Sequence, residues 1–196
     1  FQHLSDSISN WQELDSDQPS GFLVYEGRNI WQFTDRFEMT DYFFPYAKLA
    51  ERQDLLPLVG FYRFGYRLIA ASTNERTLVA AILTPGSVCT QSISVERNTK
   101  LRLTHQVLAL CSFWNSSAVD YLARQRIAAT VNKFLLETIP VASLESAWVY
   151  LAHSALRLAC NHVGYAPLWA EQLGDEWREG TPRHTWPVLA GNDVRW

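Results

Sequence analysis

Residues 61–83 read FYRFGYRLIAASTNERTLVAAIL, and the expected architecture follows from this stretch more than from any other. Its first part, 61–71, is apolar and aromatic, with Arg63 and Arg67 spaced so that one face of a strand would be wet. Its last part, 77–83, is a short continuous apolar run, which is typical of a buried strand. The stretch therefore predicts two strands joined by a polar loop.

Strand patterns continue on both sides of this stretch. Residues 22–33 predict a strand, a turn at Gly27 and a second short strand. Residues 46–53 predict a two-turn helix. Residues 88–95 alternate between apolar and polar side chains, so they could pair with 77–83.

The hydrophobic period becomes helical after residue 102. We expect two helices, 103–114 and 117–128, that meet at Asn115 and form a hairpin. Residues 133–139 predict another strand, and Ser143 can begin a further helix. The apolar face expected for that last helix consists of Leu144, Trp148, Leu151, Ala155 and Leu158.

These patterns place the chain in the α+β class. We expect a mixed β-sheet domain with a helical hairpin over residues 1–140. A helical C-terminal extension of the same fragment follows over residues 141–196.

The composition is that of a folded chain without a membrane span. Of the 196 residues, 47% are hydrophobic and 19% are charged, which excludes the disordered class. No run of about 18 apolar residues occurs. The three cysteines are widely spaced, which argues against a disulfide scaffold and fits the reducing cytoplasm. Because the sequence begins with Phe1 and not with Met, we expect a piece of a longer chain, or a processed one.

The net charge of −3 hides an uneven distribution. Residues 1–60 carry a net charge of −6, residues 61–140 a net charge of +5, and residues 141–196 a net charge of −2. Most of the basic residues are Arg, whose planar fork can engage guanine edges or phosphates with two bonds. A basic middle segment can hold a polyanion on one face. Alternatively, these arginines form ordinary surface ion pairs, which composition alone favours.

The usual sequence signatures of catalysis are missing. The nine glycines never cluster before a helix, as dinucleotide and phosphate loops require. The string nearest to the [Asn/Asp]-Pro-Pro-[Tyr/Phe] loop of amino-methyltransferases is Phe43-Phe44-Pro45-Tyr46, which lacks the polar first residue and the second proline. The five histidines have no zinc spacing, and no G-x-S-x-G elbow occurs. We expect no catalytic residue and no metal site in this chain.

Three stretches remain, and they occur in a fixed order. They are VYEGRNIWQF at 24–33 with Arg36 close behind, YRLIAASTNERTLVAAIL at 66–83, and LALCSFWNSSAVDYLARQR at 108–126 followed by VNKF at 131–134 and IPV at 139–141. Together they resemble the target-recognition region of adenine-specific DNA methyltransferases from restriction–modification and related phage-defence systems. Many of these are single-chain enzymes in which the specificity region follows the methylase domain. The resemblance covers less than half of the chain.

The resemblance implies a target-recognition domain over residues 1–140 that binds double-stranded DNA in the bacterial cytoplasm. The parent enzyme would flip an adenine out of the duplex and methylate it with S-adenosylmethionine, and it could also be an endonuclease. The methyltransferase domain would precede Phe1 in the same parent chain, so no cofactor is expected here. Family members often have Asp-His where Thr34-Asp35 stands, and Arg where Ala71 stands. Because of the Ala71 difference, no sequence preference is carried over.

Thirteen residues are candidates for contact with DNA. They are Arg28, Asn29, Gln32, Arg36, Arg67, Thr73, Asn74, Arg76, Thr77, Arg124, Arg126, Asn132 and Lys133. They belong to the Gly27 turn, to the polar loop between the two apolar strands, and to the end of the helical hairpin. Each group has a structural alternative: Arg28 could pair with Glu26, Glu75 could pair with Arg76, and an arginine at the helix end could interact with the helix dipole.

Two other functions stay open on the sequence alone. A protein-interaction or scaffold module of the same defence systems would use the eight Trp residues and the acidic amino-terminal third. A hydrolytic enzyme would need a pocket that contains a carboxylate and a histidine, for example Asp120 with His105. No spacing in the sequence indicates such a pocket.

Overall fold

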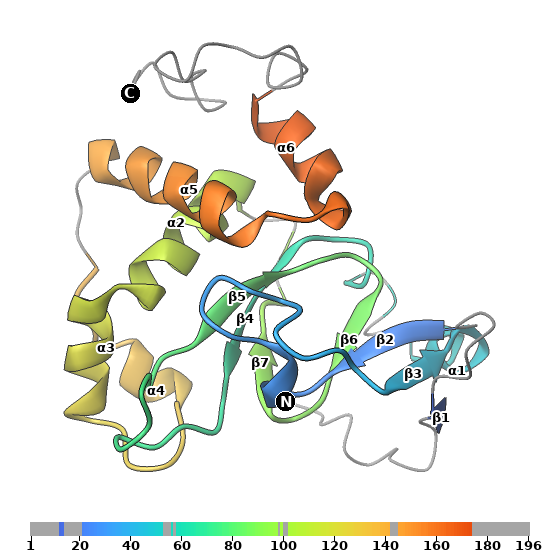
Figure 1. The fold of residues 1–196 in the computed structure, drawn as a ribbon, viewed down its shortest axis with the longest axis horizontal. Coiled ribbons are helices and arrows are strands. Elements are labelled where there is room, and N and C mark those ends of the chain that lie inside the picture. The colour runs from blue at the N-terminus through green and yellow to red at the C-terminus, as the bar shows by residue number, and fades with distance from the viewer. Residues whose placement is uncertain are drawn as a thin grey trace.

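The computed structural model describes residues 12–13, 21–52, 56, 58–97, 99, 102–141 and 145–173, which fold as an α+β structure (Figure 1). The strands are β1 (Gln12–Glu13), β2 (Gly21–Tyr25), β3 (Tyr42–Pro45), β4 (Arg63–Arg67), β5 (Ala80–Leu83), β6 (Ser87–Cys89) and β7 (Ile93–Val95). The α-helices are α1 (Tyr46–Ala50), α2 (Thr104–Asn115), α3 (Ser117–Arg124), α4 (Lys133–Leu136), α5 (Glu145–Ala159) and α6 (Ala166–Leu173). Two short 3-10 helices are η2 (Gly27–Asn29) and η3 (Val163–Tyr165).

The strands form two small sheets. One has the order β1-β3-β2-β6, in which β2 and β6 are parallel and the other pairs are antiparallel. The other has the order β5-β4-β7 and is antiparallel throughout. The chain crosses between the two sheets after β3, after β5 and again at the short turn between β6 and β7. The first sheet is therefore mixed, as predicted.

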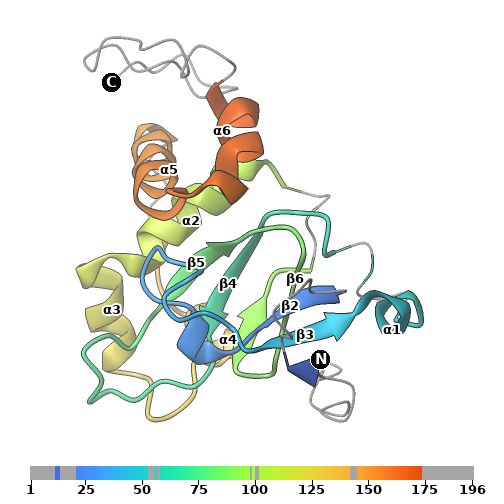
Figure 2. The same ribbon diagram turned by 45° about the vertical axis from the view of Figure 1, so that its right-hand side comes forward.

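The largest hydrophobic core lies between the three-stranded sheet and the helices. Helix α2 lies next to this sheet, and α5 packs along α2 (Figures 1 and 2). Residues of this core that are almost completely buried include Leu78 and Ile82 beside or in β5, Leu108 and Cys111 in α2, and Ala152, Ala155 and Leu156 in α5. The predicted extension therefore supplies a helix to the same core as the predicted domain. Among the described residues, no helix has the length and apolar character to cross a membrane.

Most of the predicted elements are confirmed. Residues 61–71 contain β4, residues 77–83 contain β5, and the two helices of the hairpin are α2 and α3. The hairpin turns at Ser116, whose hydroxyl accepts a hydrogen bond from the N–H of Val119 and so begins α3. Helix α1 is one turn shorter at its end than predicted.

Three predictions about strands are wrong. Residues 133–139 do not form a strand, because they begin with helix α4. Residues 88–95 contribute to β6 and β7, which pair with β2 and β4 and not with 77–83. No second strand follows Gly27: the chain forms η2 and then an isolated bridge between Trp31 and Thr34.

The faces of two elements also differ from the prediction. Arg63 does not lie on a wet face of β4, since it is 5% exposed. On α5, Ala155 is buried as expected, but Leu158 is exposed and Leu156 is buried in its place. Leu144 and Ser143 lie outside the described residues. Helix α6 was not predicted at all.

Leu156 and Leu158 allow a matched test of this packing. Leu156→Ala should lower the free energy of unfolding by about 2–5 kcal/mol, because it opens a cavity between α5 and α2. Leu158→Ala, on the exposed side of the same helix, should change it by less than about 0.5 kcal/mol. Urea denaturation measures both values, and equal losses would contradict the described orientation of α5.

The cysteines provide a second test. All three are free and buried, and burial raises the pKa of Cys89 to about 11 and that of Cys111 to about 12, with a rise for Cys160 as well. Because the thiolate is the reactive form, we expect almost no reaction with Ellman's reagent at pH 8 in the native state. All three thiols should react after denaturation. Rapid native labelling of one thiol would show that its surroundings open to solvent.

Candidate nucleic-acid interface

The end of helix α2 is fixed to strand β5 by one amide side chain. The Oδ1 atom of Asn115 accepts from the N–H of Ala80 at 3.1 Å, and its Nδ2 donates to the Ala80 carbonyl at 2.8 Å. The same Nδ2 donates to the Cys111 carbonyl within α2 at 3.0 Å. Asn115 therefore occupies the hydrogen-bonding position that a neighbouring strand would take beside β5.

The carboxylate of Asp120, on α3, lies at the centre of a second set of bonds. Its Oδ1 accepts from the N–H groups of Thr77 and Leu78 at 2.8 and 2.7 Å. Its Oδ2 lies 3.1 Å from Nη2 of Arg124 and 3.9 Å from Nη1 of Arg76. Asp120 is only 4% exposed, so its charge is compensated almost entirely by protein groups.

The two arginines beside Asp120 also connect the loop that precedes β5 to the helical hairpin. Arg76 donates to the carbonyl of Asn115, at the end of α2. Arg124 donates to the carbonyls of Ser72 and Glu75 at 3.0 and 2.8 Å. We refer to Arg76, Asn115, Asp120 and Arg124 as the Asp120 cluster. It joins the polar loop 72–77 to the corner of the helical hairpin.

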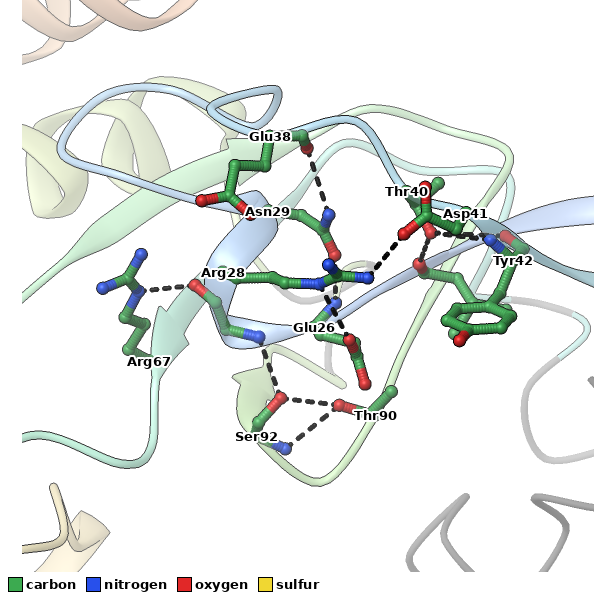
Figure 3. Close-up of polar contacts among 12 residues, drawn as sticks. Glu26, Arg28, Asn29, Glu38, Thr40, Asp41, Tyr42, Arg67, Thr90 and Ser92 are labelled. Atoms are coloured by element: carbon green, nitrogen blue, oxygen red, sulfur yellow. Dashed lines mark hydrogen bonds and ion pairs between the residues drawn. The ribbon is translucent and has the colours of Figure 1, made fainter. Parts of the chain in front are cut away.

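A third arginine holds the Gly27 turn. The Nε atom of Arg67, on β4, donates to the carbonyl of Gly27 (Figure 3). Its Nη2 atom donates to the carbonyl of Ile30 at 2.7 Å. Its guanidinium also lies 4.8 Å from the centre of the Trp31 ring. Burial lowers the pKa of Arg67 from its usual value. Arg67 therefore fixes the backbone of the Gly27 turn through two of its carbonyl groups.

Within the Gly27 turn, Asn29 and Arg28 have different surroundings (Figure 3). Asn29 is fully buried: its Oδ1 accepts from the N–H of Glu26 at 2.6 Å, and its Nδ2 donates to the Glu38 carbonyl at 3.1 Å. Arg28 is exposed and pairs with Asp41 at 2.7 Å and with Glu26 at 3.1 Å. The pairing with Glu26 that the sequence left open is therefore present.

The Gly27 turn is also connected to the Asp120 cluster. Gln32 donates to the carbonyl of Asn115 at 3.2 Å. The N–H of Phe33 donates to the carbonyl of Ala80 at 3.1 Å. All three stretches that carry the resemblance thus contact one another, although they lie far apart in the sequence.

A buried contact between Asp35 and His162 was not predicted. His162 Nε2 lies 3.0 Å from Oδ1 of Asp35, and its Nδ1 accepts from the N–H of Gly164 at 3.1 Å. Because Nδ1 accepts a hydrogen bond, Nε2 carries the proton and donates to Asp35. Both ring nitrogens are engaged, so the pair ties the loop after Phe33 to the turn before α6 and has no free basic nitrogen for acid–base chemistry. His105, which sequence reasoning paired with Asp120, is not among its partners.

The loop 26–38 and the segment after β4 border an open hollow of about 900 Å³. Trp31 and Phe37 form its aromatic wall, with stacked rings whose centres are 5.4 Å apart. Ile69, which is 67% exposed, lies on the opposite side with Glu75. We call this surface the Trp31 hollow. Glu26 and Glu38 also line it, so carboxylates outnumber the guanidinium groups of Arg28 and Arg67 around it.

The remaining candidate residues lie at the surface, and none of them lines this hollow. Ile69 forms a bridge with Thr130, which places the segment after α3 beside the segment after β4. The exposed candidates are Arg36, Thr73, Asn74, Arg126, Asn132 and Lys133. Arg126 donates to Thr138, and Lys133 pairs with Glu137 at 3.4 Å. The guanidinium of Arg36 lies against the Tyr25 hydroxyl.

The structure therefore divides the thirteen candidates into two groups. One group supports the loops from inside and consists of Asn29, Gln32, Arg67, Arg76, Thr77 and Arg124. The other group, with Arg28, faces solvent. No sequence signal distinguishes the groups, because an arginine in a polar loop has the same appearance whether it meets water or a carbonyl. Among the described residues, no group of three His, Cys, Asp or Glu side chains could hold a metal ion.

Comparisons of the chain with protein-family models, with curated proteins and with solved structures find no significant match.

The Asp120 cluster yields a test of its structural role. Asp120→Asn keeps an acceptor but removes the charge between two guanidinium groups, and we expect it to lower the free energy of unfolding by about 2–4 kcal/mol. Asp41→Asn also removes a carboxylate beside an arginine, but on an exposed pair, and should have little effect. Chemical denaturation compares the two, and similar small changes would contradict the central place of Asp120.

Proposed function

We propose that this chain is a sequence-specific recognition module for double-stranded DNA, and that it belongs to an adenine-specific methyltransferase that uses S-adenosylmethionine. One observation carries the proposal. The three stretches that resemble the recognition region of such enzymes meet in a single polar unit, through Gln32, Arg76 and Asp120.

The same geometry supports a division of labour between the candidate residues. Arg67 and the Asp120 cluster fix the backbone of two loops, and these loops present Arg36 and Asn74 at the surface. Loops that are rigid before binding lose little entropy when they bind. The proposed reading surface is therefore the rim of the Trp31 hollow.

The chemistry of this rim suits base edges better than phosphates. The Asn74 amide can donate to and accept from adenine, the carboxylates of Glu38 and Glu75 can accept from the amino group of cytosine, and Ile69 can contact a thymine methyl group. Phosphate contacts would come from Arg36, Arg126 and Lys133, which lie outside the hollow.

The catalytic step belongs to the proposed parent enzyme. S-adenosylmethionine would supply the methyl group there, and the residues of this chain would orient the duplex by holding its bases and backbone. The proposal assigns no catalytic residue to this chain.

Salt dependence tests the phosphate contacts. Binding of the 196-residue chain to a fluorescent duplex with random sequence is measured by anisotropy from about 50 to 200 mM salt. Arg36→Ala should weaken binding to all sequences and reduce the slope of log K against log[salt] by about 0.9, the value for one phosphate contact. Arg157→Ala, on helix α5, should leave the slope unchanged. An unchanged slope for Arg36→Ala would remove this residue from the interface.

Selection from a pool of random duplexes tests the base contacts. The chain should enrich one sequence, and Asn74→Ala should enrich a different or more degenerate one. If no sequence is enriched at about 50 mM salt, the DNA-reading proposal fails.

The exposed apolar side chains around the hollow favour a second candidate, a protein-interaction module. Phe37, Met39 and Ile69 are each more than half exposed. Truncation of Phe37 to Ala would then abolish binding of a partner protein and leave the selected DNA sequence unchanged.

A further inference from the structure

A separate cavity of about 290 Å³ lies beside β4, β6 and β7, and Arg63 lines it. Its walls are mostly apolar and include Val59, Leu68, Val88, Ile93 and Val95. This size is at the lower end of the range for small-molecule sites, about 300–1,000 Å³. We call it the Arg63 cavity.

Arg63 is buried, and the described residues give it no ion pair. Its side chain donates through Nη2 to the carbonyl and the hydroxyl of Ser87, the latter at 3.1 Å. Its Nε is buried and has no hydrogen-bond partner, and no carboxylate of the described residues forms an ion pair with it. Removing a cation from water without an anion costs several kcal/mol, so this arrangement needs an explanation.

The neighbouring groups compensate this charge only in part, because burial lowers the pKa of Arg63 by more than Glu96 raises it. Glu96 lines the cavity, but its carboxylate accepts two bonds from Arg102, at 2.7 and 2.9 Å. Cys89 also lines it, and burial raises the pKa of this thiol to about 11, so it is neutral at pH 7. Burial likewise lowers the pKa of Arg63, but a guanidinium stays protonated in proteins.

The outer part of the cavity is also not acidic. Lys133 and Arg97 line it, and Lys133 pairs with Glu137 on α4. The described residues that line the cavity therefore carry a net positive charge. Arg63 is the buried cation among them.

We propose that the Arg63 cavity binds a small organic carboxylate with an apolar body. The carboxylate accepts hydrogen bonds from the Arg63 guanidinium, whose planar donors match its two oxygens. The apolar body lies against the valine, leucine and isoleucine side chains. This cavity shares no lining residue with the Trp31 hollow, and Lys133, a proposed phosphate contact, lies in its wall.

Calorimetric titration of the 196-residue chain with 4-phenylbutyrate and with the neutral analogue 4-phenylbutanol tests the proposal. The acid should bind at least tenfold more tightly than the alcohol. Arg63→Met should remove this preference, whereas Arg157→Met, the same substitution on the exposed side of α5, should keep it. Equal affinity of the native chain for acid and alcohol, or no binding of the acid at about 10 mM, would overturn the proposal.

Thermal denaturation separates loss of the site from loss of the fold. Since Arg63 has no ionic partner, Arg63→Met should leave the melting temperature unchanged or raise it. A folded Arg63→Met protein that still prefers the acid would refute the proposed contact. If that variant does not fold, Leu58→Trp provides a second test, because Leu58 lines the cavity and a larger side chain there narrows it while Arg63 remains. The Trp variant should lose acid binding, and unchanged binding would also refute the proposal.

Discussion

The buried carboxylate of Asp120 is the contact on which the rest of the arrangement depends. Strand β5 has β4 on one side only, so its other edge is open, and the N–H groups of Thr77 and Leu78 just before it would lack partners. Unpaired buried N–H groups cost about 1–3 kcal/mol each, and exposed strand edges promote aggregation. Asp120 and Asn115 satisfy these groups from the corner of the helical hairpin. The hairpin therefore covers the open edge of β5. These bonds hold α2 beside the sheet, and α5 packs against α2.

Local patterns were sufficient to predict most of the elements but not their neighbours. The alternation in 61–71 and the apolar run in 77–83 predicted β4 and β5, because burial on one or both faces leaves a period in the sequence. Residues 88–95 have a similar period whichever strand they pair with, so their pairing with β2 and β4 could not be read from it. The seven residues 133–139 are too short for periodicity to separate a helix from a strand.

The candidate site was predictable as a set of residues but not as a set of roles. Arg76 and Asp120 are 44 positions apart, so no local feature shows that they meet, whereas the spacing of four residues between Asp120 and Arg124 is one that permits an ion pair on a helix. Alternation along a strand shows which side chains share a face, but it does not show whether that face is exposed to solvent. Arg63 was therefore predicted on a solvent-exposed face, although it is buried. The contacts among the three stretches join residues far apart in the sequence, so no single stretch predicts them.

The arginines of the basic middle segment are compensated to different degrees. An ion pair with a carboxylate cancels the charge of an arginine, whereas a hydrogen bond to a carbonyl does not. Arg124 and Arg102 face carboxylates, so their charges are compensated locally and add little to the surface potential. Arg67 and Arg63 donate to carbonyl oxygens, which satisfy donors but cancel no charge. Arg67 has the carboxylates of the Trp31 hollow around it, whereas Glu96, the acidic group in the wall of the Arg63 cavity, is bound to Arg102. Arg63 therefore carries one of the positive charges that the described residues leave uncompensated, and it lies in an apolar cavity, where a low dielectric strengthens its attraction for an anion.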